Sequence, residues 1–221
     1  MRQPARRLVL LGGGTWHDFP MAARVLGEAF SPYTRVEYTE DAGSLAHGAL
    51  QGADALALYT CLAAEDPGLA HKAHAEFPAA AARAVESFVA QGGAFLGLHS
   101  TLCSFMGWTG LGEIMGGRWV WGETGHDPVA PFAVRVRTGH PIVTDLGPFE
   151  VNDEHYFKLK MLRDVDVLLE SDWRGAVQPQ GWATTYGKGR VFVSVLGHTA
   201  EALGHPAHRR FLTAGLAWAL P

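Results

Sequence analysis

The stretch that decides the fold is Gly92-Gly-Ala-Phe-Leu-Gly-Leu-His99-Ser100-Thr101. Two glycines end a helical pattern, five residues follow that are typical of a buried strand, and the chain then turns into polar residues. Such a strand-turn-helix is typical of a nucleophile elbow, in which a sharp turn presents one side chain above the sheet. The register predicts that this side chain is the imidazole of His99, pointing outward with Ser100 beside it. The alternative is that His99 caps the helix that follows.

Outward from this stretch, apolar strands alternate with helical patterns. Strands are expected at 7–11, 34–38, 53–59 and 94–98, and helices at 19–30 and 79–91. Strands separated by helices favour βαβ units, and therefore an α/β fold with a doubly wound, mostly parallel sheet and helices on both faces. After residue 107 we expect a short helix, an ordered loop and then strands, with the helix at 111–115, a strand at 133–136, further strands over 148–171, a hairpin of 182–186 with 190–196, and a closing helix at 207–220. No linker or repeat interrupts the chain, so residues 1–221 are expected to form a single domain.

Composition excludes several classes of partner. The 221 residues are 48% hydrophobic and 18% charged, with a formal net charge of −4, which argues against nucleic-acid binding. No apolar window approaches the length of a membrane helix, and no signal peptide is recognisable, so we expect a cytoplasmic protein without a membrane partner. The two cysteines are too few for a disulfide framework and do not have zinc-site spacing, and Cys103 is expected to be a small buried hydrophobe. The sequence leaves open whether the chain forms a homo-oligomer.

Three of the expected strands are followed by a histidine in a short glycine-bearing segment. His17 follows the first strand, His99 the fourth and His198 the last. In open α/β sheets, ligands bind outside the carboxyl ends of the strands, so we expect these imidazoles to share one polar pocket. Histidine acts as acid, base or metal ligand near neutral pH, which makes the pocket a candidate functional site. His126, in a similar segment in the middle of the chain, is expected to join it.

Each of these segments also has a structural interpretation. The run Gly12-Gly-Gly14 partly resembles a dinucleotide-binding fingerprint, but a tight turn between strand and helix explains it more simply, with Asp18 as the helix N-cap. His198 with Glu201 fits either an oriented acid or base, or a capping box. His205 and His208 are expected on a helix surface, and His71 and His74 in a solvated segment.

The segment Asn152-Asp153-Glu154-His155-Tyr156 places titratable groups on an expected strand. Side chains alternate between the two faces of a strand, so only one of Glu154 and His155 can face the pocket. Two tryptophans in the glycine-rich middle, Trp119 and Trp121, are suited either to stacking on a sugar ring or to packing in the core.

These segments resemble the trehalose-utilisation (ThuA-like) family of the class I glutamine amidotransferase-like superfamily. The resemblance is carried in order along nearly the whole chain by Gly14-Thr-Trp-His17-Asp18, Gly92 to Ser100, Gly125-His126-Asp-Pro, His140-Pro-Ile-Val-Thr-Asp-Leu, Asp153-Glu154-His155-Tyr156 and Tyr186 to His198. It implies a flavodoxin-like doubly wound fold and a link to disaccharide or glycoside metabolism. Amidotransferase relatives have a cysteine where His99 stands, so glutamine hydrolysis through a thioester is not expected. The family pattern has an apolar residue at the position of His155, which favours Glu154 for the pocket.

Together, these observations predict an enzyme that acts on a disaccharide or an oxidised (3-keto) glycoside by isomerisation, elimination or hydrolysis. His99 and His198 are the candidate acid and base, and Glu154 is a second base or an orienting group. The predicted substrate contacts are His17, His126, Ser100, Trp119 and Trp121. Metal-free proton transfer is one mechanism; the other uses a divalent metal such as zinc, for which the candidate ligands are His17, His99, His126 and His198. The rival hypothesis is a non-catalytic sugar- or partner-binding module that kept the fold and lost the nucleophile.

Overall fold

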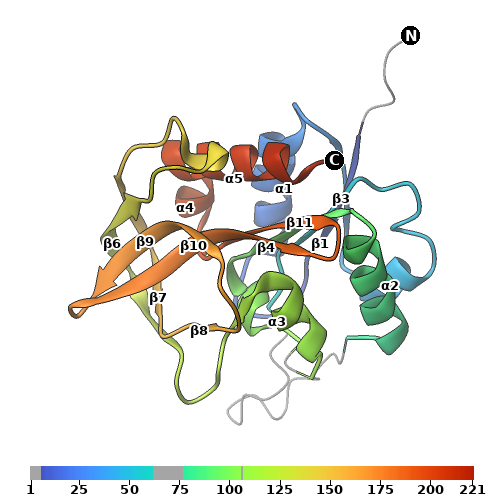
Figure 1. Ribbon diagram of the computed structural model, residues 1–221, viewed down its shortest axis with the longest axis horizontal. Helices are drawn as coiled ribbons and strands as arrows, with labels where there is room; N and C mark the ends of the chain where they lie inside the picture. The colour runs from blue at the N-terminus through green and yellow to red at the C-terminus, as the bar shows by residue number, and fades with distance from the viewer. Residues whose placement is uncertain (1–5, 62–76, 106) are drawn as a thin grey trace.

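The structure is a computed structural model that describes residues 6–61, 77–105 and 107–221. Within these residues, nine strands form one sheet in the order β2-β1-β3-β4-β11-β10-β9-β6-β7 (Figure 1). Its strands are β1 (Arg7–Leu11), β2 (Arg35–Thr39), β3 (Ala55–Leu58), β4 (Ala94–Leu98), β6 (Gly125–Val136), β7 (Phe149–Phe157), β9 (Asp166–Trp173), β10 (Ala176–Tyr186) and β11 (Gly189–Ser194). Two short strands, β5 (Gly117–Arg118) and β8 (Lys160–Met161), pair separately. His71 and His74 lie outside the described residues.

The first five strands of this order, β2, β1, β3, β4 and β11, are parallel to one another. Strands β3 and β4 are buried along their whole length, as expected of apolar runs covered on both faces of a parallel sheet. The remaining strands β10, β9, β6 and β7 extend the sheet in antiparallel pairs, starting from the predicted hairpin of β10 with β11. The predicted α/β sheet is thus confirmed, with an antiparallel extension.

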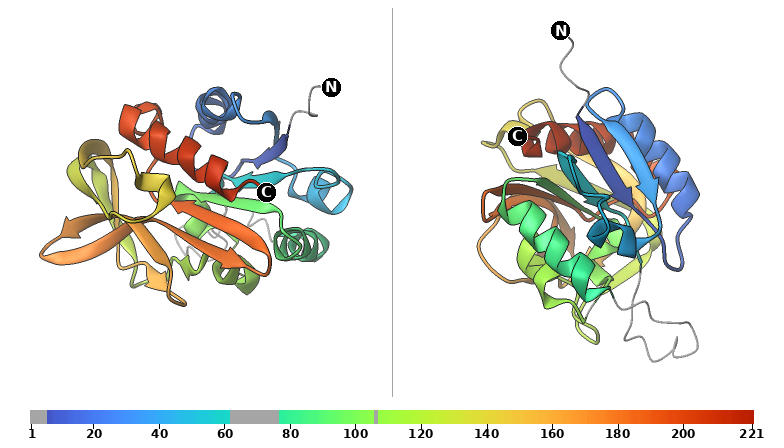
Figure 2. Two further views of the ribbon diagram at one scale, coloured as in Figure 1. Left: turned by 45° about the horizontal axis from the view of Figure 1, so that its top comes forward. Right: turned by 90° about the vertical axis from the view of Figure 1, so that its right-hand side faces the viewer.

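Helices cover both faces of the sheet, as predicted (Figures 1 and 2). One layer contains α1 (Phe19–Phe30), α4 (Ala200–Gly204) and α5 (Pro206–Ala219), which contact one another, and the other contains α2 (Ala79–Ala90) and α3 (Thr109–Met115). Short 3-10 turns complete the fold: η1 (Ala42–Ala46), η3 (His99–Cys103) and η4 (Pro141–Val143). Asp18 caps α1 by accepting the backbone N–H of Met21, as the sequence predicts. None of the helices in the described part of the chain is long and apolar enough to cross a membrane.

The antiparallel extension curls back over the carboxyl ends of the parallel strands. Strand β7 is last in the sheet order, yet Asn152 on β7 donates a hydrogen bond to Glu201 of α4, and Phe149 stacks on His205. Glu201 therefore serves the contact with β7 and forms no capping box with His198, because Thr199 is the N-cap of α4. This curl brings a strand from the far end of the sheet to the edge where β1, β4 and β11 end.

Two expectations about the chain after residue 107 are wrong. The segment around His126, expected to be an ordered loop, is the beginning of β6, which pairs with β7 from Gly125 onward. Its outward positions carry mixed polar and small residues, so strand alternation is weak there. His208, expected at a helix surface, is fully buried between Ser194 and the carbonyl of Ala202.

Candidate active site

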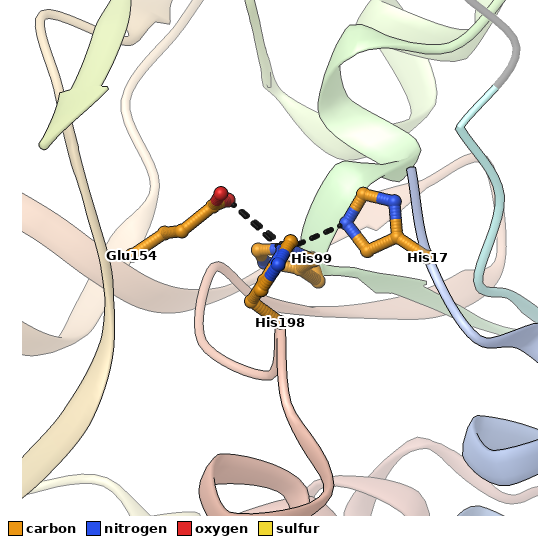
Figure 3. Close-up of side chains that lie close together, drawn as sticks. All are labelled: His17, His99, Glu154 and His198. Atoms are coloured by element: carbon orange, nitrogen blue, oxygen red, sulfur yellow. Dashed lines mark hydrogen bonds and ion pairs between the residues drawn. The ribbon is translucent and has the colours of Figure 1, made fainter. Parts of the chain in front are cut away.

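Four polar side chains from four separate segments converge at the carboxyl edge of the sheet (Figure 3). His17 follows β1, His99 follows β4 and His198 follows β11, so the three predicted strand-end imidazoles do meet. Glu154 on β7 completes the cluster. One ligand-type atom of each of the four residues lies within 4.8 Å of all the others. We call these four residues the His/Glu cluster.

The elbow holds His99 in a conformation that side chains rarely adopt. Its backbone φ is +48°, in the left-handed region, as a sharp turn directly after a strand requires. The expectation that the imidazole is exposed is wrong, because the ring is fully buried, beneath the cavity rather than in it. Its Nδ1 lies 2.8 Å from the carbonyl oxygen of Val195 and must donate to it, since a carbonyl can only accept. Burial lowers the pKa of His99 well below 6.5, so Nε2 carries a lone pair.

That lone pair of His99 points at the other groups of the site. Nε2 lies 3.6 Å from Oε2 of Glu154 and 3.4 Å from the hydroxyl of Tyr156. His17 is arranged in the same way: its Nδ1 donates to the carbonyl of Thr15 at 3.0 Å, and its Nε2 lies 3.2 Å from Nδ1 of His198. Two imidazoles are thus oriented from behind by backbone carbonyls, the arrangement that typically orients histidine ligands of metals.

The position of His198 depends on its neighbours on β7 and just after β3. Its Nδ1 lies 3.2 Å from Oε2 of Glu154, as well as from His17. Its backbone N–H and that of Gly197 donate to the carboxylate of Asp153, and the hydroxyl of Tyr59 donates to the Gly197 carbonyl at 2.8 Å. The loop that carries His198 is therefore held from two sides.

Strand alternation on β7 decides which of its side chains reach the site. Glu154 and Tyr156, two residues apart, both line the cavity. His155 faces the other way, where its ring stacks on Phe132 at 4.2 Å and its Nε2 hydrogen-bonds Ser171. The prediction that Glu154 rather than His155 faces the pocket is therefore confirmed.

A cavity of about 440 Å³ opens over the cluster. The predicted contact residues Trp119, Trp121 and His126 lie in its wall, together with Trp16, Cys61 and Cys103. The indole N–H groups of Trp119 and Trp121 are buried and have no hydrogen-bond partner among the residues that the structure describes. Ser100 is different: it is fully buried and is not among the residues of the cavity wall, so the structure does not place it where a substrate contact is expected.

His126 lies beside the cluster rather than within it. Its Nδ1 is 3.4 Å from Oε1 of Glu154, the carboxylate oxygen that faces away from the other imidazoles, and 42% of its side chain is exposed. It does not belong to the group of ligand atoms within 4.8 Å of one another. The group that could hold a metal ion therefore contains Glu154 and three of the four expected histidines, without His126.

The two cysteines also meet at the site, which was not expected from the sequence. Cys61 follows β3, Cys103 lies in the turn after β4, and their sulfur atoms are 3.9 Å apart. Cys103 and His17 lower the pKa of the Cys61 thiol to about 6 against the effect of burial, while the same contact raises the pKa of Cys103. Burial alone would lower the pKa of His17, but Cys61, Thr15 and Glu154 outweigh it and raise it. The available signal was the position of each cysteine just beyond a strand end.

The comparisons with known proteins agree with this architecture. A putative ThuA-like protein from Parabacteroides merdae superposes with a TM-score of 0.79 at 17% identity, over 98% of this chain and 90% of that one. A cytoplasmic protein from Salmonella typhimurium LT2 gives a TM-score of 0.66 at 15% identity, over 97% of this chain and 100% of that one. A glutamine amidotransferase from Thermotoga maritima gives a TM-score of 0.53 at 13% identity, over 87% of this chain and 76% of that one. No curated protein matches the sequence.

The fold is that of an α/β protein and is similar to the fold of a glutamine amidotransferase, with a histidine at the elbow of this chain. The sequence model of the family ThuA, described as trehalose utilisation, matches residues 9–219. The chain therefore belongs to the trehalose utilisation family, and a carbohydrate-related role follows from that membership.

Proposed function

We propose that the protein is a metal-dependent enzyme that acts on a carbohydrate, with the His/Glu cluster as the binding site of a divalent cation. The observation that carries this proposal is the orientation of His17 and His99, whose Nδ1–H groups are fixed by backbone carbonyls while both Nε2 atoms face the same small volume. Lone pairs held this close repel one another unless a cation or a proton lies between them.

Three of the separations within the cluster are close to those around such a cation. Ligand atoms about 2.0–2.2 Å from zinc in a tetrahedral site are roughly 3.3–3.6 Å apart. The observed separations are 3.2 Å from His198 to His17, 3.2 Å from His198 to Glu154 and 3.6 Å from His99 to Glu154. Imidazole nitrogens with one carboxylate suit zinc and related transition metals. The cavity would let an oxygen of the substrate approach a cation held by these residues.

The cavity has the chemical character of a sugar site. Trp119, Trp121 and Tyr156 form an aromatic wall, and sugar rings present C–H faces that stack on such surfaces. The wall also carries the carboxylate of Glu154 and the imidazoles of His17, His126 and His198, which suit hydroxyl or carbonyl groups. The family description points to trehalose or a related glycoside, and 3-keto derivatives are included in the proposal because a carbonyl is the group that a cation polarises best.

Within this proposal the roles of the histidines differ. A bound cation supplies Lewis-acid stabilisation of a sugar oxygen. His17, His99 and His198 hold it with Glu154, and buried His99 acts as a ligand rather than as the acid or base. His126 is suited to proton transfer, because Glu154 orients its Nδ1 while part of the ring is exposed at the cavity.

The experiment measures metal content, affinity and turnover on the same preparations. Protein stripped with a chelator is titrated with zinc by calorimetry, and turnover of trehalose, 3-keto-trehalose and related glycosides is measured with and without metal. We expect one zinc per chain, loss of high-affinity binding in His99→Ala and Glu154→Gln, and turnover that depends on metal. His47→Ala, at an exposed histidine outside the cavity wall, is the matched control. Wild type that binds no divalent metal contradicts the proposal; sugar binding without turnover indicates the binding-module alternative.

A further inference from the structure

The two cysteines are placed for a reaction that the proposed function does not use. Cys61 and Cys103 are both free thiols and both lie in the cavity wall. Their sulfur atoms are 3.9 Å apart, and a disulfide needs them at about 2.05 Å. Each sulfur must move by about 1 Å to close this distance, by rotation about the Cα–Cβ bonds together with a shift of the backbone at Cys61. Cys61 is 2% and Cys103 6% exposed, so a small solute in the cavity meets both at its wall.

The fold explains why the two thiols meet. Strands β3 and β4 are neighbours in the parallel sheet, with Leu58 opposite Gly97, and both chains continue past the carboxyl edge toward the cysteines. The side chain of Thr101 donates to the carbonyl of Leu58, which fixes the turn after β4 against the end of β3. The thiol of Cys103 is held by a hydrogen bond to the carbonyl of Ser100 at 3.0 Å, a weak contact that is easily broken.

Cys61 is also joined to the segment that carries His17. Its carbonyl accepts the backbone N–H of Thr15 at 3.0 Å, and its own N–H donates to the carbonyl of Gly13 at 3.1 Å. Gly14 lies so close that an added Cβ would be 2.2 Å from the Cys61 carbonyl oxygen. The two backbones are hydrogen-bonded and in direct contact, so a shift of Cys61 also moves the loop of residues 13–17.

We propose that Cys61 and Cys103 are a reversible redox-modification site, which a peroxide oxidises to an intramolecular disulfide that displaces His17 and weakens metal binding at the His/Glu cluster. The metal-related part of this inference rests on the proposed function; the disulfide does not.

The reaction balances with a peroxide as oxidant. The sulfur of one thiol attacks a peroxide oxygen, the O–O bond breaks, and a sulfenic acid and one molecule of water form. The second thiol attacks the sulfenic sulfur, the S–O bond breaks, and the disulfide and a second water form. Two electrons pass from the sulfurs to the peroxide, and the thiol protons leave in the two waters. A dithiol reductant reverses the modification by thiol–disulfide exchange.

The disulfide is tested on metal-free protein by mass spectrometry after treatment with hydrogen peroxide. We expect the wild type to lose two hydrogens, about 2 Da in mass, and peptide mapping to link the cysteine pair. Cys103→Ser, which keeps a similar side chain at that position, should instead gain one or more oxygens on Cys61. Two surviving free thiols, oxygen addition to both sulfurs in the wild type, or a disulfide between two chains would each overturn the proposal.

The effect on the site is tested by zinc titration of oxidised and reduced protein. We expect the oxidised form to bind at least tenfold more weakly, and dithiothreitol followed by its removal to restore the affinity. Since thiolates also bind zinc, the double variant Cys61→Ser/Cys103→Ser is titrated as control and should match reduced wild type before and after peroxide. Equal affinity of both wild-type forms would overturn the link to His17. If no form binds zinc, the metal site fails, and with it this link, while the mass measurement still decides on the disulfide.

Discussion

The carboxylate of Asp153 accepts the backbone N–H groups of both Gly197 and His198, at 2.6 and 2.9 Å. Strand β7 therefore sets the position of the loop after β11, and with it the imidazole of His198. Asp153 is fully buried, and burial raises its pKa to about 6 although these hydrogen bonds favour the charged form. Asp153 is not a member of the His/Glu cluster. Its side chain nevertheless fixes the backbone of His198, which is a member.

We expect Asp153→Ala to lower the free energy of unfolding by about 2–4 kcal/mol, because it leaves two buried N–H groups without a partner. Zinc affinity should fall as well, since the His198 loop loses one of its two attachments. Urea denaturation and calorimetry measure the two effects. Asp145→Ala, at an exposed carboxylate paired with Arg210, is the control and should change stability by less than about 0.5 kcal/mol. A loss of similar size in both variants would show that Asp153 has no special role.

His126→Ala should separate metal binding from chemistry. The ligand atoms of the His/Glu cluster do not include those of His126, so we expect one zinc per chain to remain. Removal of a proton-transfer group lowers turnover by about 10²–10⁴-fold, mostly in kcat. Metal analysis and steady-state kinetics check this, with the exposed His47→Ala as the matched control. Loss of zinc from His126→Ala would instead make His126 a ligand.

Gly14→Ala should disturb the site through the backbone. Gly14 has φ +127°, and an added Cβ would lie 2.2 Å from the carbonyl oxygen of Cys61. We expect a loss of about 1–3 kcal/mol of stability, with weaker zinc binding because His17 is three residues away. In Gly27→Ala, nothing lies within 4 Å of the added atom and the residue is inside α1, so that variant should be slightly more stable than wild type. Thermal unfolding of Gly14→Ala and Gly27→Ala measures the expected loss and the expected gain of stability. Equal stability of Gly14→Ala and wild type would mean that the loop adapts.

Much of the site could be predicted because the carboxyl ends of parallel strands meet at one edge. That rule places His17, His99 and His198 together, and the alternation of β7 with the family resemblance selects Glu154. The curl that brings β7 over this edge depends on contacts between distant segments, such as Asn152 with Glu201, and has no local sequence signal. For that reason the sequence could not show that Glu154 lies inside the cluster and His126 beside it.

The meeting of the two cysteines and the burial of His208 were not predicted, although the sequence contains a signal for each. Cys61 and Cys103 obey the same strand-end rule as the histidines, since β3 and β4 are adjacent. In α5, His208 shares the helical spacing of the buried residues Leu212, Gly215 and Ala219, which places it on the inner face. The residue type suggested a surface position, but periodicity is the better guide when a histidine has partners for both ring nitrogens.

Those partners make His208 a source of pH-dependent stability. Its Nδ1 donates to the carbonyl of Ala202 at 2.8 Å, its Nε2 lies 2.9 Å from the Ser194 hydroxyl, and burial lowers its pKa to about 4. The unfolded chain, with a pKa near 6.5, binds the proton more readily between these values. The contribution of neutral His208 to the free energy of unfolding is therefore fully present above pH 6.5. As the pH falls toward 4, about 3 kcal/mol of it is lost.

We expect His208→Gln, which titrates in neither state, to show a weaker fall in stability than wild type over this interval, whatever its stability at pH 7. Urea denaturation at a series of pH values measures the slopes, and the exposed His47→Gln should keep the slope of the wild type. Parallel curves for wild type and His208→Gln would mean that His208 takes up its proton in the folded state as easily as in the unfolded chain. The burial between Ser194 and Ala202 predicts that the wild-type curve instead falls more steeply as the solution becomes acidic, because the wild type alone must then hold a charge at a fully buried position.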